Sequence, residues 1–126
     1  MPDQPKTTSE LETGVRSLKA DSTGESVCAW LATFKQATYK KVFKDSMDPE
    51  LMEDIFDCLD KTWHAGGNKD RNVKIMNQLA KVAGALGVVM MVMGDTGKFA
   101  VAKMIEDVGD DAVTKSFWRK AFSDLL

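Results

Sequence analysis

The chain has few of the side chains that carry out most enzyme chemistry. Its 126 residues contain one histidine, His64, and two cysteines, Cys28 and Cys58, which stand far apart without the spacing of a metal or redox site. A zinc site would have too few soft ligands, so we expect no metal and no other cofactor. Two reduced thiols are typical of a cytosolic protein, and we expect a cytoplasmic location.

An excess of charge of either sign is also missing. The chain has 17 basic and 19 acidic residues and a net charge of −2, whereas nucleic-acid binding draws mainly on a basic surface. The polar N-terminus lacks the apolar core of a signal peptide. The longest nearly uncharged run, residues 82–94, is too short to span a bilayer. We therefore expect neither nucleic acid nor a membrane as a partner.

Convincing strand patterns are absent, because no stretch alternates apolar and polar residues over six positions. From Val27 onward, apolar residues recur at steps of three and four, as on one face of a helix. Asp48-Pro49-Glu50 is a strong start signal for a helix that ends at Gly66-Gly67. The sequence predicts an all-α fold, a compact helical bundle of five to seven short helices.

The chain divides into two parts by composition. Residues 1–24 are poor in large apolar groups, so we expect a flexible N-terminal tail, with a short, weakly docked helix bearing Leu11, Val15 and Leu18 as the alternative. Residues 25–126 form the helical domain. A bend is expected near residues 83–87, and Asp110 or Asp111 is expected to cap the last helix.

The stretch GVVMMVMGDTGK, residues 87–98, resembles a buried strand that leads into a phosphate-binding loop. A P-loop needs a glycine five residues before its Gly-Lys pair and a hydroxyl after it, but Val92 and Phe99 occupy these two positions. The other interpretation is a buried helix that ends at Gly94, followed by a second helix capped by Asp95 or Thr96. We favour this second interpretation, so no nucleotide is expected.

Other candidate chemistry has a plainer explanation in each case. His64 could be a general base, but a histidine near the C-terminal end of a helix is favoured by the helix dipole alone, and no nucleophile pairs with it. Five acidic residues lack the calcium-loop pattern and recur at helical spacing, which favours a solvated helix face. They are Glu50, Glu53, Asp54, Asp57 and Asp60.

Methionine is abundant, with eight residues, three of them in residues 90–93. Methionine fills irregular cores and also lines adaptable binding grooves. Most of this segment is expected to be core, and Met91 falls off the main apolar stripe, so an exposed position remains open for it.

The order of these segments resembles the C-terminal domain family of RNA polymerase II-associated protein 3, the potential Monad-binding region. The resemblance rests on residues 39–59, YKKVFKDSMDPELMEDIFDCL, with an aromatic residue upstream at Trp30. It continues through residues 75–82, IMNQLAKV, and through the apolar helix at residues 90–93 that leads to Lys98. It spans roughly residues 27–108.

The resemblance implies a helical protein-interaction module without catalysis. Family members are similar to scaffolds that assemble large complexes and axonemal dynein arms, and the domain is linked to RuvB-like AAA+ ATPases and to the WD-repeat protein Monad. We therefore expect residues 25–126 to be an adaptor domain of co-chaperone type, monomeric on its own, that binds a protein partner. The alternative is a small helical protein that binds a lipid or another apolar ligand.

Two surfaces compete as the docking site for that partner. The resemblance favours the corner that carries Lys81, Met91 and Lys98. The terminal helix offers aromatic and basic residues of the kind found in binding hot spots, with core packing as the other explanation for its rings. These residues are Phe117, Trp118, Arg119 and Phe122.

Overall fold

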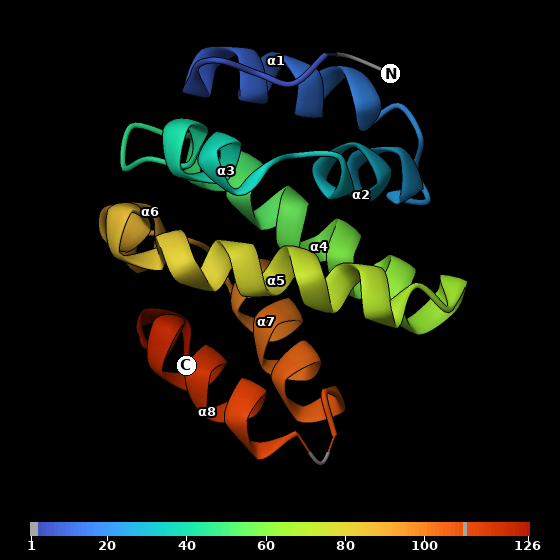
Figure 1. The fold of residues 1–126 in the computed structure, drawn as a ribbon, viewed down its shortest axis with the longest axis vertical. Helices are drawn as coiled ribbons and strands as arrows, with labels where there is room; N and C mark the ends of the chain where they lie inside the picture. Colours follow the sequence, from blue (N-terminus) through green and yellow to red (C-terminus); the bar gives the residue numbers. More distant parts are fainter. Residues whose placement is uncertain (1–2, 110) are drawn as a thin grey trace.

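The computed structural model describes residues 3–109 and 111–126, and this part of the chain is all-α with no strand (Figure 1). The helix α5 continues through a 3-10 turn, η1, into α6 as one helical stretch, which gives seven helices and confirms the predicted bundle. The elements are α1 (Thr8–Leu18), α2 (Glu25–Ala32), α3 (Gln36–Val42), α4 (Pro49–Gly66), α5 (Lys69–Val82), η1 (Ala83–Leu86), α6 (Gly87–Met91), α7 (Asp95–Asp107), α8 (Ala112–Ala121) and η2 (Ser123–Leu125).

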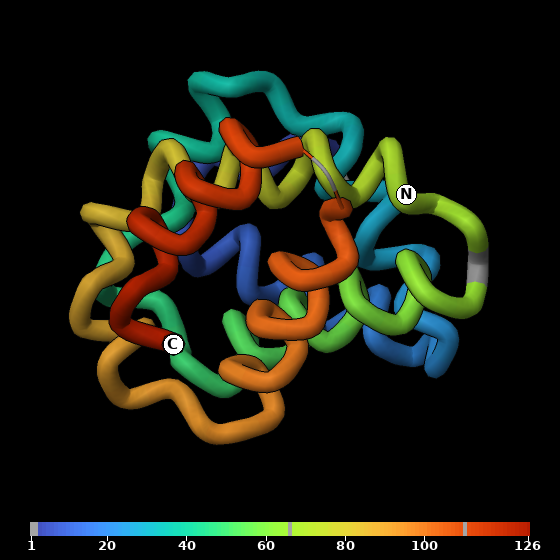
Figure 2. The backbone as a smooth tube through the Cα atoms, turned by 90° about the horizontal axis from the view of Figure 1, so that it is seen from below, coloured from blue at the N-terminus to red at the C-terminus, as the bar shows by residue number. Residues whose placement is uncertain are grey.

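The helices are stacked along the long axis of the molecule (Figure 1). At one end α1 covers α2 and α3, while α4 and α5 cross the middle and α7 and α8 lie at the other end. The most extensive helix contact joins α4 to α7, and α8 packs on both α5 and α7. Seen along that axis, α7 and α8 lie side by side over the middle layer (Figure 2). One core therefore runs through all the layers.

The N-terminal segment differs from the flexible tail expected for residues 1–24. Helix α1 begins after Thr7, whose side chain accepts a hydrogen bond from the Glu10 backbone N–H at 3.1 Å, and its Leu11 and Val15 are fully buried in the common core. The structure agrees instead with the alternative, a short helix that bears Leu11, Val15 and Leu18, because Leu11 and Val15 are buried where α1 packs on α2, α3 and α4. Residues 1 and 2 lie outside the described residues.

The start of α4 follows its sequence signal. The Asp48 carboxylate accepts a hydrogen bond from the Glu50 backbone N–H at 3.0 Å, and Pro49 occupies the first turn, where its missing N–H costs nothing. The helix ends at Gly67, whose φ of 70° is the left-handed conformation that glycine adopts most easily.

The expected bend at residues 83–87 is present as η1, between α5 and α6. The stretch from Lys69 to Met91 is nevertheless long and apolar enough, by length and composition, to cross a membrane, with a mean hydropathy of 1.2 over its most apolar window. Half of that window is buried inside the bundle, and a core helix of a soluble protein passes the same test. The stretch is therefore weak evidence for a membrane span. It is longer than the nearly uncharged run of residues 82–94, because the helical stretch begins at Lys69.

The terminal helix α8 is capped by Asp111, which accepts a hydrogen bond from the Thr114 backbone N–H at 3.0 Å. The other candidate cap, Asp110, lies outside the described residues. The helix inserts Trp118, whose ring meets Trp63 edge-on at 6.2 Å between centroids. Phe122, which directly follows the helix, meets Phe56 in the same way at 5.8 Å. Both rings close the core at this end of the bundle.

Candidate protein-binding surface

A carboxylate of α4 contacts the corner between α6 and α7. Oε1 of Glu53, on α4, accepts a hydrogen bond from the Gly97 backbone N–H at 3.1 Å, in the first turn of α7. The expected caps, Asp95 or Thr96, do not act: Gly94 is the N-cap and makes no side-chain cap bond. The positive end of α7 is thus already matched with a negative charge from another helix.

Two glycines allow this close approach. A Cβ atom on Gly97 would lie 2.5 Å from Sδ of Met93 and 2.8 Å from Cγ of Glu53, and one on Gly94 would lie 3.1 Å from the Glu53 carboxylate oxygens. The glycine pair that resembles a phosphate loop therefore serves helix packing. A carboxylate at the place where a phosphate would bind repels an anion, which supports the helical interpretation of this stretch.

Four large apolar side chains are exposed around this corner, and we call them the corner patch. Val88 and Met91 lie on α6 and Val92 directly follows it, at the spacing of one helix face, and Phe99 stands in the second turn of α7. Their exposed fractions are 60%, 68%, 64% and 68%. Exposed apolar side chains that gather within one short stretch mark interaction sites more often than scattered ones do.

The methionines of the corner fall into a buried pair and one exposed residue. Met90 and Met93 are buried in the core, where they pack with Leu86 and Val89 in the common cluster. Met91 points away from that cluster and is exposed. The segment thus fills the core with one face and presents the other to solvent.

The two lysines predicted for this surface are Lys81, before the corner patch in the chain, and Lys98, next to Phe99. Lys81 is exposed in the last turn of α5, and Lys98 is half-buried in the first turn of α7. Within the described part of the chain neither lysine forms an ion pair. Lysine ammonium groups therefore remain available beside the corner patch.

The terminal helix is mainly a core element, which corrects half of its predicted site. Trp118 and Phe122 are fully buried, and Trp118 Nε1 donates a hydrogen bond to Asn77 Oδ1 at 2.7 Å. Phe117 is only 39% exposed, and Arg119 faces solvent, 3.2 Å from a carboxylate oxygen of Glu106. The aromatic spacing that suggested a hot spot comes instead from the face that α8 turns to α5 and α7.

His64 lies in the last turn of α4, where its ring nitrogens face carboxylates. Its Nε2 is 3.0 Å from Oδ1 of Asp60, and Lys103 Nζ is 3.1 Å from the other oxygen of the same carboxylate. Asp60 is therefore buried and paired, which corrects its assignment to a solvated helix face; Asp54 and Asp57 of the same acidic set pair with exposed lysines near the surface. Among the described residues no group of three potential ligands could hold a metal ion.

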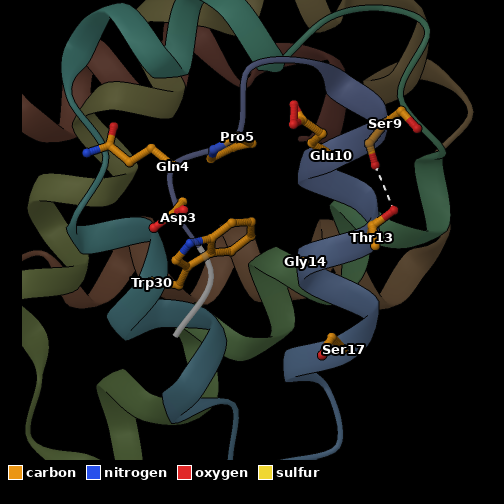
Figure 3. A pocket seen from close by; sticks show the side chains of 9 residues that line it. All are labelled: Asp3, Gln4, Pro5, Ser9, Glu10, Thr13, Gly14, Ser17 and Trp30. Atoms are coloured by element: carbon orange, nitrogen blue, oxygen red, sulfur yellow. Dashed lines mark hydrogen bonds between the residues drawn. The ribbon is translucent and has the colours of Figure 1, made fainter.

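A hollow of about 430 Å³ lies between the N-terminal segment and α1 (Figure 3). The buried Trp30 ring forms its floor, and Gly14 of α1 faces that ring so closely that a Cβ would lie 2.2 Å from it. Hydroxyl and carboxyl groups line the walls, including Ser9, Thr13 and Glu10. The hollow is open to solvent, and the polar groups on its walls distinguish it from the enclosed apolar cavity that a lipid would need.

The Cys28 and Cys58 thiols, far apart in the sequence, are both buried and free. The Thr62 hydroxyl donates to the Cys58 carbonyl at 2.8 Å and lies 3.5 Å from Cys28 Sγ. Burial raises the pKa of the Cys58 thiol to about 12 and raises the pKa of Cys28 as well. Since the thiolate is the reactive form, neither cysteine is prepared to act as a nucleophile.

Comparison with known proteins gives one match. No curated protein and no solved structure matches the chain. Residues 4–98 match the family described as the potential Monad-binding region of RPAP3, which includes α1 and reaches back beyond the 27–108 range of the resemblance. The match ends at Lys98, so the whole of α6 lies inside it and α8 lies outside. Because the match covers most of the chain, the chain belongs to the family of the potential Monad-binding region of RPAP3.

Proposed function

We propose that this chain is a non-catalytic adaptor domain that binds a folded protein partner through the corner patch, in chaperone-assisted assembly of large complexes in the cytoplasm. The observation that carries the proposal is the family match over residues 4–98, a family described by its potential to bind Monad. A WD-repeat protein of the Monad type is the first partner to test, and a RuvB-like AAA+ ATPase is the second. The domain is proposed to be a monomer before it binds.

The corner patch supports this choice of surface in three ways. Three of its four side chains, Val88, Met91 and Val92, are the large apolar side chains exposed among the described residues of the match, whereas Phe99, like Val113, Phe117 and Leu126, lies beyond residue 98. The Glu53 contact fixes the backbone of the corner, so little conformational entropy is lost on binding. Lys81 and Lys98, which form no ion pair among the described residues, can add polar contacts at a rim.

A binding experiment with matched variants tests the proposal. Met91→Glu places a charge in the centre of the corner patch, where desolvation on binding would be costly. Val113→Glu makes the same kind of change at a residue that is 81% exposed but outside the matched region. We expect calorimetry with purified Monad to show binding by the wild type and by Val113→Glu, and at least about tenfold weaker binding by Met91→Glu.

The same measurement with RuvB-like ATPases distinguishes the two partner classes. Equal affinity of the Met91→Glu and Val113→Glu variants for whichever protein binds would rule out the corner patch as the interface. Absence of binding to either class would remove the adaptor proposal itself.

A further inference from the structure

Five lysines gather on and around α3 without a partner of opposite charge. They lie in the N-terminal segment, at the start of α3, near its end and in the turn that follows, and each is exposed. The ion pairs of the described residues involve other basic groups. The five are Lys6, Lys35, Lys40, Lys41 and Lys44.

Three of these lysines surround one hollow. A depression of about 360 Å³ lies between the N-terminal segment and α3, and Lys6, Lys35 and Lys41 stand on its walls. The other lining residues are uncharged: Gln4, Pro5, Ala37 and Thr38. Because no carboxylate lines the hollow, its positive charge is not neutralised from within.

The hollow is held open by hydrogen bonds of Gln4. Its Oε1 accepts from the Lys35 backbone N–H at 3.2 Å and from the Thr38 hydroxyl at 2.8 Å, and its Nε2 donates to the Thr33 carbonyl at 2.9 Å. The Lys6 backbone N–H donates in turn to a Glu10 carboxylate oxygen at 3.0 Å. These bonds fix the N-terminal segment against the start of α3. Lys6, Lys35 and Lys41 therefore face the same space.

We propose that this lysine hollow binds an acidic protein segment, a short stretch rich in aspartate and glutamate. Three ammonium groups around an uncharged floor offer several charge-assisted hydrogen bonds to carboxylates. The size of the hollow suits a few side chains. This site is separate from the corner patch and does not depend on the proposed Monad-type partner.

Two features favour an acidic peptide over a nucleic acid or an anionic membrane. The chain as a whole carries a net charge of −2, so the surface outside the lysine hollow is acidic on balance and repels a long polyanion or a charged bilayer. The lining also contains no aromatic ring on which a base could stack. A short segment that reaches only the hollow avoids the repulsion.

Fluorescence anisotropy of the full chain with a labelled peptide of alternating Asp and Glu tests the proposal. The matched peptide of Asn and Gln should not bind. The variant Lys6→Gln/Lys35→Gln/Lys41→Gln should bind the acidic peptide about tenfold more weakly, since each exposed ion pair contributes a factor of a few. The control Lys69→Gln/Lys74→Gln/Lys120→Gln removes the same charge from exposed positions outside the hollow and should bind within about twofold of wild type.

A second variant separates the shape of the hollow from its charge. Gln4→Ala leaves every lysine in place but removes the bonds that hold the N-terminal segment, so it should also weaken binding. Circular dichroism confirms that each variant is folded. Equal losses in the two triple variants, an unchanged affinity in Gln4→Ala, or tighter binding to an oligonucleotide or to phosphatidylserine vesicles than to the acidic peptide would each overturn the proposal.

Discussion

The Glu53 carboxylate lies 3.1 Å from the Gly97 backbone nitrogen and so caps a helix that begins 42 residues further along the chain. The first turn of α7 has backbone N–H groups without intrahelical acceptors, and one of them is satisfied by a side chain from α4. The same contact holds the corner patch in place. The Glu53 carboxylate therefore contributes both to the stability of the fold and to the shape of the proposed interface.

Two substitutions of Glu53 should destabilise the protein to different degrees. Glu53→Gln keeps an acceptor for the Gly97 N–H and loses the negative charge at the helix end, which is worth about 0.3–1 kcal/mol. Glu53→Ala loses the acceptor as well and should cost about 1–2 kcal/mol in the free energy of unfolding. Urea denaturation measures both values. If Glu53→Ala proved as stable as the wild type, the carboxylate would not be the cap.

Lys98→Ala should leave the free energy of unfolding within about 0.5 kcal/mol of wild type, because the ammonium group lies near the surface without an ion pair among the described residues. The wild type should also show no binding of ATP or GTP in calorimetry, since Glu53 already occupies the end of α7. Micromolar nucleotide affinity that disappears in Lys98→Ala would contradict this account of the glycine-rich corner.

Substitution of Gly14 tests whether α1 is a necessary part of the bundle. In Gly14→Ala the new Cβ would lie 2.2 Å from Cη2 and 2.6 Å from Cζ3 of the Trp30 ring, and a rigid buried ring cannot move aside cheaply. We expect a loss of about 1–3 kcal/mol. Gly84→Ala is the matched control, because no atom lies within 4 Å of its Cβ. A similar stability of both variants would mean that α1 does not dock as described.

Much of the fold could be predicted from the sequence, because helix signals are local. Asp48-Pro49 marked the start of α4, and the glycines at residues 84 and 87 marked the bend that became η1. The cap of α7 could not be predicted, because Glu53 is 44 residues away from Gly97 in the chain. The close packing of α1 could not be predicted either, because the Trp30 ring that Gly14 meets comes from another helix.

The residues of the candidate site were also predicted only in part. Met91 was expected off the apolar stripe, and it is exposed. Val88, Val92 and Phe99 were missed as surface residues because apolar side chains are read as core unless their spacing excludes it. At Trp118 the sequence left core packing and docking both open, because aromatic spacing with adjacent basic residues describes a core helix as well as a binding helix, and the ring is buried.

Alkaline pH should destabilise the protein through its buried thiols and Tyr39. Burial raises the pKa of Cys58 to about 12 and also raises the pKa values of Cys28 and of Tyr39, whose hydroxyl donates to the Leu31 carbonyl at 2.7 Å. The folded state therefore keeps protons that the unfolded state releases above about pH 9, and the free energy of unfolding falls as pH rises.

Urea denaturation at a series of pH values measures this dependence. The double variant Cys28→Ala/Cys58→Ala should start from a lower stability, because two buried side chains are truncated. Its further decrease between about pH 8 and pH 10 should be smaller than that of the wild type, because fewer groups change protonation. An identical pH dependence in both proteins would show that the thiols do not contribute.

Truncation of α8 should unfold the domain. Trp118 and Phe122 are fully buried and meet rings on α4, and the Trp118 indole N–H donates to Asn77 of α5. Removal of residues 112–126 would expose those surfaces and leave Asn77 without this partner. Because each large aromatic side chain contributes about 3–5 kcal/mol on truncation, the loss approaches the whole stability of a typical domain.

Point variants make the same test without removing the helix. Trp118→Ala should lower the free energy of unfolding by about 3–5 kcal/mol. Phe117→Ala removes a ring of similar size one residue earlier, on the more exposed face of α8, and should cost about 1 kcal/mol or less. Urea denaturation followed by circular dichroism compares the two. Because α8 lies outside the family match, Phe117→Ala should also bind the partner like the wild type. If Trp118→Ala kept its stability but lost partner binding, the terminal helix would be the interface after all, and the corner patch would lose its role.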